Sequence, residues 1–179
     1  RKNPFGGEYT VFAGLDEVLK FVKNFKFTEK QIDYLKTLMP NTKPEFFVWL
    51  ASVDMKSIKI YALKEGTICF PYEPLIRVEG PIAICQLLET TILNLINFPS
   101  LVCTNAARHV VAINNGNDGN NKCGTLVEFG LRRAQGPDGG MSASKYSYMG
   151  GAAGSSNVQA GQMFGVPISG TMAHSFITS

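Results

Sequence analysis

The chain has 179 residues, of which 45% are hydrophobic and 17% are charged, and its net charge at pH 7 is +3. These values are typical of a globular protein with a real core. The small net charge, without any run of Lys and Arg, argues against a nucleic-acid partner. The longest apolar run, 82–96, is interrupted by several polar residues, which argues against a membrane-spanning helix.

Four cysteines stand 16 to 20 residues apart, at positions 69, 85, 103 and 123. No Cys-x-x-Cys pair occurs, and neither His109 nor His174 stands at the spacing of a zinc site. We therefore expect no protein-bound metal. Buried, reduced thiols in a cytosolic protein are the interpretation that fits this pattern.

Both ends of the sequence resemble the interior of a longer protein. The first seven residues, Arg1 to Gly7, contain no initiator Met and no signal-peptide pattern, and the last four, Phe176 to Ser179, form no polar tail. We expect the chain to be an internal fragment.

The first third of the chain predicts one strand followed by three helices. Alternation over 8–13 predicts the strand, with Tyr9, Val11 and Ala13 on one face. Apolar residues at helical spacing predict a helix over 15–25. A capping box at Thr28 and Gln31 predicts a second helix that stops at Pro40, and Pro44 opens a third over 44–50, whose aromatic residues should face a core.

From Ser57 onward the apolar period changes to two, which predicts a small antiparallel or mixed sheet from the runs 58–62, 67–70 and 75–78. An apolar helix should then run from Ile82 to about Asn97. Pro99 is predicted to end it, and Ser100 to cap a second helix over 101–113. The asparagine-rich segment 114–122 should be a flexible surface loop.

The last quarter of the chain carries the residues suited to chemistry. A short strand over 125–130 is followed directly by Arg132 and Arg133, and ligands of α/β proteins sit at the carboxyl ends of parallel strands. Further along we expect a turn over 136–140, a helix over 141–149 and a small-residue loop over 150–154. A capped helix over 158–164 and a short strand over 165–170 should follow. This order suggests the opening of a β/α barrel.

His174 lies just past that last strand, among small hydroxyl residues. Its imidazole could act as an acid, a base or a phosphoryl acceptor, or could simply hydrogen-bond a neighbouring backbone group. Neither Gly-x-Ser-x-Gly nor a Walker A loop is present, so a hydrolase triad and a P-loop are disfavoured.

The segments 128–140 and 170–175 closely resemble nicotinate phosphoribosyltransferases of the eukaryotic type. Shorter matches support the same resemblance at 4–7, 86–90, 104–108, 146–148 and 156–161. The resemblance covers nearly the whole chain. Its departure from the family is the asparagine-rich segment, which looks like an insertion.

The resemblance implies that nicotinate and phosphoribosyl pyrophosphate are joined to give nicotinate mononucleotide and pyrophosphate, on the way to NAD. It implies that the reaction is coupled to ATP hydrolysis, which would make the enzyme a ligase. It also implies that His174 is the phosphorylated histidine, which would make the enzyme a phosphoprotein. Thr171 would contact nicotinate, Arg132 and Arg133 the anionic substrate, and Ser175 would help hold the transferred group. Mg²⁺ would assist the pyrophosphate leaving group.

The implied fold is an α/β protein of the type II phosphoribosyltransferase kind. An α+β N-terminal domain, 1–122, with a long helix pair would precede 123–179, the first strands and helices of an irregular, here truncated, β/α barrel. The family resemblance further implies a cytoplasmic homodimer whose active sites are completed across the dimer. We expect the 179-residue chain alone to be inactive.

Two other interpretations stay open at the level of sequence. The first is a neighbouring enzyme, a nicotinamide or quinolinate phosphoribosyltransferase. The Arg132-Arg133 pair favours an acid substrate over an amide only weakly, because arginine also binds phosphate. The second is a truncated, non-catalytic module for dimerisation or binding.

Overall fold

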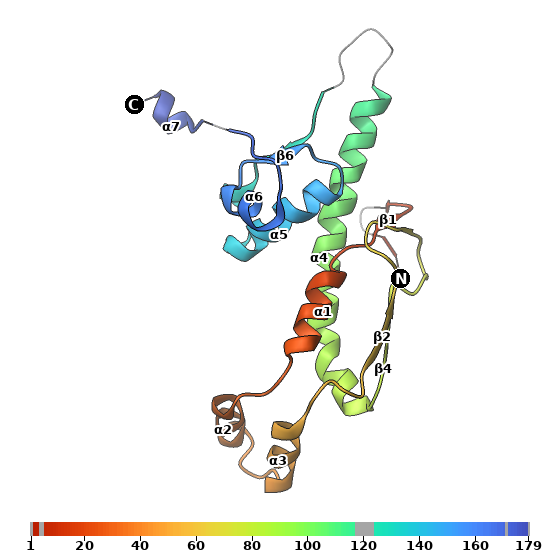
Figure 1. Cartoon of the computed structure of the whole chain (residues 1–179), viewed down its shortest axis with the longest axis vertical. Helices are drawn as coiled ribbons and strands as arrows, with labels where there is room; N and C mark the ends of the chain where they lie inside the picture. Colours follow the sequence, from red (N-terminus) through yellow and green to blue (C-terminus); the bar gives the residue numbers. More distant parts are fainter. Residues whose placement is uncertain (1, 4–5, 117–123, 171, 179) are drawn as a thin grey trace. The chain divides into compact units, whose positions relative to one another are not determined.

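A computed structural model of the chain describes residues 2–3, 6–116, 124–170 and 172–178. The described residues form two compact units (Figure 1). Unit 1 comprises Arg1–Gly14, Leu63–Leu75 and Ile96–Ser179, and unit 2 comprises Leu15–Ala62 and Ile76–Leu95. These units are defined by packing and do not coincide with the predicted domains 1–122 and 123–179. The predicted domain boundary after residue 122 stays a prediction.

Unit 2 contains the three helices predicted for the first third of the chain. They are α1 (Leu15–Asn24), α2 (Glu29–Leu38) and α3 (Pro44–Ser52). The capping box is confirmed: the Gln31 amide donates to Thr28 Oγ1 at 3.4 Å, and the Thr28 amide donates to Gln31 Oε1 at 2.8 Å. Pro44 occupies the first turn of α3, as predicted.

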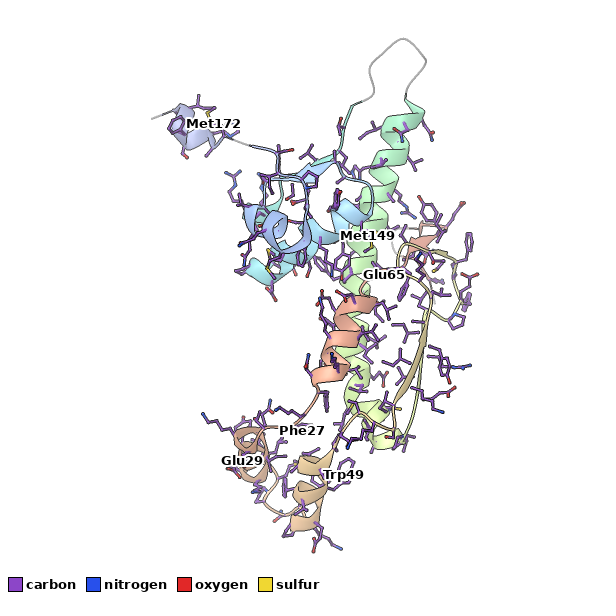
Figure 2. All side chains as sticks on the ribbon, in the orientation of Figure 1. Phe27, Glu29, Trp49, Glu65, Met149 and Met172 are labelled. Carbon is purple, nitrogen blue, oxygen red and sulfur yellow. The ribbon has the colours of Figure 1, made fainter. Side chains whose placement is uncertain are left out.

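The helices α2 and α3 share a core of Ile32, Phe47 and Leu50. The predicted core role of the α3 aromatic cluster is therefore confirmed for Phe47. It is wrong for Trp49, which is 39% exposed at the surface of α3 (Figure 2). Because α3 buries only one narrow stripe, the residue two positions beyond Phe47 falls outside it.

The predicted single sheet is in fact two separate two-stranded antiparallel sheets. In unit 2, β2 (Lys59–Ala62) pairs with β4 (Ile76–Glu79), and in unit 1, β1 (Thr10–Val11) pairs with β3 (Ile68–Cys69). After the turn at Gly66, the chain hydrogen-bonds to Phe12 instead of continuing along β2: the Gly66 amide donates to the Phe12 carbonyl at 2.8 Å, and the Phe12 amide to the Thr67 carbonyl at 2.9 Å. These bonds divert β3 to the N-terminal strand.

The long helix α4 (Ile82–Asn115) is continuous, with Pro99 inside it. The prediction of two helices separated at Pro99 was therefore wrong. Ser100, expected to cap a second helix, instead exchanges two side-chain hydrogen bonds of 3.1 Å with the backbone of Ala13, and Thr104 Oγ1 accepts from the Val11 amide at 2.8 Å. These tertiary bonds hold the helix through the proline, which removes one backbone donor.

By length and composition alone, α4 could cross a membrane, and within the described parts of the chain it is the helix that meets this test. The core helix of a soluble protein passes the same test. The buried hydroxyls of Ser100 and Thr104 bond the backbone of 11–13, which is the behaviour of a helix packed in a protein core. The absence of a membrane partner stays a prediction.

The end of α4 bears on the predicted asparagine-rich loop. The helix extends through Asn114 and Asn115, so the first two residues of the predicted loop are helical. Residues 117–122 lie outside the described part of the chain.

Unit 1 has a core of Val11, Ala13, Cys103 and Tyr146, with Tyr9 packed against it. The predicted common face of Tyr9, Val11 and Ala13 is thereby confirmed, although β1 itself is shorter than the predicted strand. Cys69 and Cys103 are buried free thiols, as predicted, and Cys85 is a half-buried one. Cys123 lies outside the described residues.

Burial raises the pKa of the Cys103 thiol to about 11 from 9.0, with a further contribution from the negative charge of Glu65. The unfolded chain loses this proton near pH 9, whereas the folded chain keeps it to about pH 11. The stabilisation from the neutral thiol is thus complete below pH 9 and is lost as the pH rises to 11.

We therefore expect the wild-type chain to lose unfolding free energy relative to Cys103→Ala between pH 9 and 11, and not between pH 6 and 8. Urea unfolding of both chains across this range measures the difference, and the other titrating groups cancel in the comparison. Parallel stability curves up to pH 11 would contradict the assignment.

The last part of unit 1 contains short parallel strands between helices. β5 (Val127–Glu128) pairs in parallel with β6 (Gly154–Ser155), and Ser155 forms a parallel bridge to Ile168. The helices α5 (Gly136–Met149) and α6 (Val158–Phe164) follow β5 and β6. Asn157 caps α6, as predicted, by accepting from the Ala160 amide at 3.3 Å.

The segment 136–140 was predicted to be a turn but forms the first turn of α5. Pro137 fits the start of a helix, where no intrahelical partner exists for its missing N–H, and Asp138 places a negative charge at the positive helix end. The fold is thus a mixed α+β arrangement, in agreement with the coarse prediction. The truncated barrel stays a prediction.

Candidate functional site

Arg132 and Arg133 lie in a short 3-10 helix, η2 (Leu131–Arg133), directly after β5. Both side chains are exposed, and no residue of η2 is buried. Because β5, β6 and the bridge at Ile168 run in parallel, the segments that follow them leave from the same edge of the strands. Two exposed guanidinium groups at this edge can meet a phosphate or a carboxylate.

A network of hydrogen bonds surrounds the half-buried carboxylate of Glu128, on the strand that precedes the arginines. The carboxylate of Glu128 accepts hydrogen bonds from Ser144 Oγ at 2.9 Å and from Ser155 Oγ at 2.6 Å, and also from the Gly130 amide. Asn157 donates to both serine hydroxyls, through its amide at 3.0 Å and its Nδ2 at 3.1 Å. The network therefore joins β5, β6, α5 and the cap of α6.

Sequence reasoning missed this network, although it had predicted a cap for the helix over 158–164. Ser144, Ser155 and Asn157 are 1%, 0% and 3% exposed. Hydroxyl and amide side chains are rarely so deeply buried unless they are bonded to one another. A signal was present only in the form of Glu128, a charged residue at an interior strand.

His174 and Ser175 lie in α7 (His174–Ile177), a four-residue helix near the C-terminal end of the described residues (Figure 1). Both side chains are exposed, and so is Met172 just before them (Figure 2). Within the described parts of the chain, no hydrogen bond or ion pair connects His174 with Arg132 or Arg133. Thr171 lies outside the described residues.

The structure therefore brings the two arginines to the strand edge but does not join them to His174. The exposed imidazole of His174 is open to a phosphoryl donor. The backbone carbonyl of His174 accepts hydrogen bonds from the Thr178 amide and hydroxyl, both at 3.0 Å. These bonds do not use the imidazole ring. The roles assigned to His174, Ser175 and Thr171 stay predictions.

Among the described residues, no group of three or more His, Cys, Asp and Glu side chains could hold a metal ion. His109 bonds the Asn105 carbonyl at 2.7 Å within α4. The described side chains therefore do not build a Mg²⁺ site of their own.

A cavity of about 550 Å³ lies elsewhere in unit 1, and none of the four predicted site residues that the structure describes lines it. Thr104, Asn105 and Arg108 of the 104–108 segment line one wall. The Arg108 guanidinium lies 5.1 Å from the centre of the Tyr9 ring and donates to the Tyr9 carbonyl at 3.4 Å. A side chain at Gly7 would collide with this guanidinium, so Gly7 leaves the room that Arg108 occupies.

Two solved structures share this fold over 99% of the chain. The crystal structure of human nicotinic acid phosphoribosyltransferase has a TM-score of 0.86 and 47% identity, and 34% of that chain is covered. A nicotinate-nucleotide pyrophosphorylase from Pyrococcus furiosus has a TM-score of 0.73 at 24% identity, with 35% of that chain covered. The strand edge with its arginines thus belongs to a phosphoribosyltransferase fold.

The sequence comparisons are more specific. Residues 1–97, more than half of the chain, match the family model of the nicotinate phosphoribosyltransferase N-terminal domain. The whole chain is 56% identical to a nicotinate phosphoribosyltransferase of Dictyostelium discoideum and 47% identical to that of Homo sapiens. The chain belongs to the nicotinate phosphoribosyltransferase family. It spans 29% and 32% of the length of these two relatives.

Proposed function

We propose that this chain forms part of an enzyme that joins nicotinate to phosphoribosyl pyrophosphate, giving nicotinate mononucleotide and pyrophosphate for NAD biosynthesis. The observation that carries the proposal is the pair Arg132 and Arg133, exposed at the carboxyl end of β5 in a chain of this family. The proposal applies to a protein of the length of the curated relatives that contains these 179 residues, here called the family-length protein.

The chemistry of this reaction explains the need for arginine. Departure of pyrophosphate leaves positive charge at the anomeric carbon of the ribose and places negative charge on the leaving group, while the ring nitrogen of nicotinate forms the new bond. Fixed cations near the phosphates stabilise the charge that develops in the transition state. Arg132 and Arg133 would hold the phosphates or the pyridine carboxylate, and Mg²⁺ bound with the substrate would neutralise the pyrophosphate.

We further propose that His174 couples the reaction to ATP. A nitrogen of its neutral imidazole would attack the γ-phosphorus, with ADP as the leaving group, and the phosphohistidine would later be hydrolysed to phosphate. The exposed position of His174 supports access of ATP to the ring, and Ser175 and Thr171 would stand beside the reacting groups. A cytoplasmic homodimer is the assembly that we propose for the family-length protein.

Replacement of His174 by alanine in the family-length protein tests this proposal. We expect the variant to lose the stimulation of nicotinate mononucleotide formation by ATP, and to lose acid-labile labelling from γ-labelled ATP, because the phosphoryl acceptor is gone. Formation of the mononucleotide without ATP should persist at the wild-type rate.

His109→Ala is the matched control, because His109 is the other histidine of the chain and is also exposed on a helix. It should keep both the stimulation and the label. Survival of the label in His174→Ala would contradict the assignment of His174. A wild-type family-length protein that makes no nicotinate mononucleotide would contradict the proposed function as a whole.

A further inference from the structure

We propose that Glu128 is a positioning residue, which fixes the turn of Arg132 and Arg133 at the strand edge through hydrogen bonds of its carboxylate. For its effect on substrate binding, this inference rests on the proposed function. The geometry of the turn can be tested without it.

The donors around Glu128 favour an acceptor that carries no hydrogen of its own. Asn157 donates to Ser155 Oγ and to Ser144 Oγ, so each hydroxyl already accepts one bond and has one proton left to donate. Both hydroxyls lie within hydrogen-bond distance of Glu128 Oε2, at 2.6 and 2.9 Å. An ionised carboxylate accepts both, and such charge-assisted bonds are about twice as strong as neutral ones.

Ser144 Oγ also lies 3.0 Å from the Gly140 carbonyl, and the two serine oxygens lie 3.3 Å apart. These are the alternative acceptors that the serine protons would take if Glu128 were replaced. They are farther from the hydroxyls than the carboxylate is. The network therefore favours the carboxylate, and loses its single charged acceptor when that group is changed.

The second carboxylate oxygen connects the network to the arginines. Glu128 Oε1 accepts from the amide of Gly130, and the carbonyl of Gly130 in turn accepts from the Arg133 amide at 2.8 Å. Gly130 is thus bonded on one side to the buried network and on the other to the arginine turn. Because no residue of η2 is buried, these bonds stabilise the turn together with the packing of Leu131 on α5 and the bond of 3.2 Å from the Ala134 amide to the Leu131 carbonyl.

Glu128→Gln is the sharpest test, because it keeps the shape of the side chain and replaces one acceptor oxygen by a donor. In the 179-residue chain, we expect the amides of Gly130 and Arg133 to exchange with deuterium at least about tenfold faster than in the wild type, since a lost hydrogen bond of about 1.5 kcal/mol corresponds to that factor. The amides of α2, in the other unit, report whether the fold is intact and should not change.

Glu89→Gln serves as the charge-matched control, because Glu89 is an exposed carboxylate on α4. It should leave the exchange of Gly130 and Arg133 at the wild-type rate. Unchanged exchange of both amides in Glu128→Gln would overturn the inference, whatever the activity of the protein.

Ser155→Ala is a milder second variant, in case Glu128→Gln fails to fold, and the adjacent Ser156→Ala is its matched control. Ser155→Ala should speed exchange at Gly130 less than Glu128→Gln does, and Ser156→Ala should not speed it. If Ser155→Ala behaves as Ser156→Ala does, the network does not hold the turn.

The kinetic consequence is measured in the family-length protein. Glu128→Gln should raise the KM of an anionic substrate by about tenfold, with a smaller change in kcat, because residues that orient binding groups typically contribute 10- to 100-fold. A tenfold fall in kcat with an unchanged KM would contradict a positioning role. An inactive wild-type protein would count against the proposed function, whereas the exchange experiment would still decide the role of Glu128.

Discussion

Alanine in place of Gly150 is expected to destabilise the chain by about 1–3 kcal/mol, since an added methyl group in a closely packed site forces the surrounding structure to move. Gly150 follows the last residue of α5, where its Cα faces α4. A Cβ there would overlap the Cys103 carbonyl oxygen and come within 2.7 Å of the Ala106 Cβ and 3.1 Å of the Ala107 amide. Two of these neighbours are backbone atoms of a helix and have little freedom to yield.

Gly139→Ala is the matched control on the same helix. A Cβ at Gly139 would meet its nearest neighbour, the Gln135 Cβ, at an ordinary 3.7 Å. The change should therefore stabilise the chain by about 0.5–1 kcal/mol, because alanine loses less backbone entropy than glycine in a helix. Urea unfolding of the three chains measures both shifts. Equal stability of Gly150→Ala and the wild type would mean that α4 and α5 do not approach as closely as described.

The elements that sequence could predict are those whose determinants lie within a few residues. The capping box joins Thr28 to Gln31, and Asn157 caps α6 through Ala160. In both cases a side chain satisfies a backbone donor three residues away, so the local sequence contains both partners. The helices α1 and α3 also begin where their sequences predict, α3 with Pro44 in its first turn.

The elements that sequence could not predict depend on distant partners. Pro99 would end an isolated helix, but the hydroxyl of Ser100 bonds the backbone of Ala13, 87 residues away, and α4 continues. Likewise, at the turn of Gly66 the chain forms backbone hydrogen bonds with Phe12 and does not continue along β2. Such choices are decided by tertiary packing, which overrides local propensity.

The candidate site divides in the same way. The position of Arg132 and Arg133 after a strand was predicted from the sequence, because the end of a strand is a property of local pattern. The role of Glu128 was not, because its hydroxyl partners lie 16 and 27 residues further along the chain. The partners of the carboxylate became visible only once β5, α5 and β6 were packed together.

Arg132→Ala in the family-length protein is expected to lower kcat/KM for nicotinate mononucleotide formation by roughly 10- to 150-fold. This range corresponds to the loss of one hydrogen-bonded contact to a charged group, about 1.5–3 kcal/mol. Arg132→Lys should recover only part of the loss, because lysine keeps the charge but not the planar fork that grips a carboxylate or phosphate with two bonds. Arg77→Ala, which removes an exposed arginine of β4 in the other unit, is the control and should have no effect.

The two substrates reveal which anion Arg132 binds. If the KM of nicotinate rises and that of phosphoribosyl pyrophosphate does not, the guanidinium binds the pyridine carboxylate, and the wild type should also reject nicotinamide, which lacks that charge. If the KM of phosphoribosyl pyrophosphate rises instead, Arg132 binds phosphate, and the preference for an acid over an amide must come from another residue. Unchanged KM and kcat for both substrates would remove Arg132 from the site, and with it the observation on which the proposed function depends.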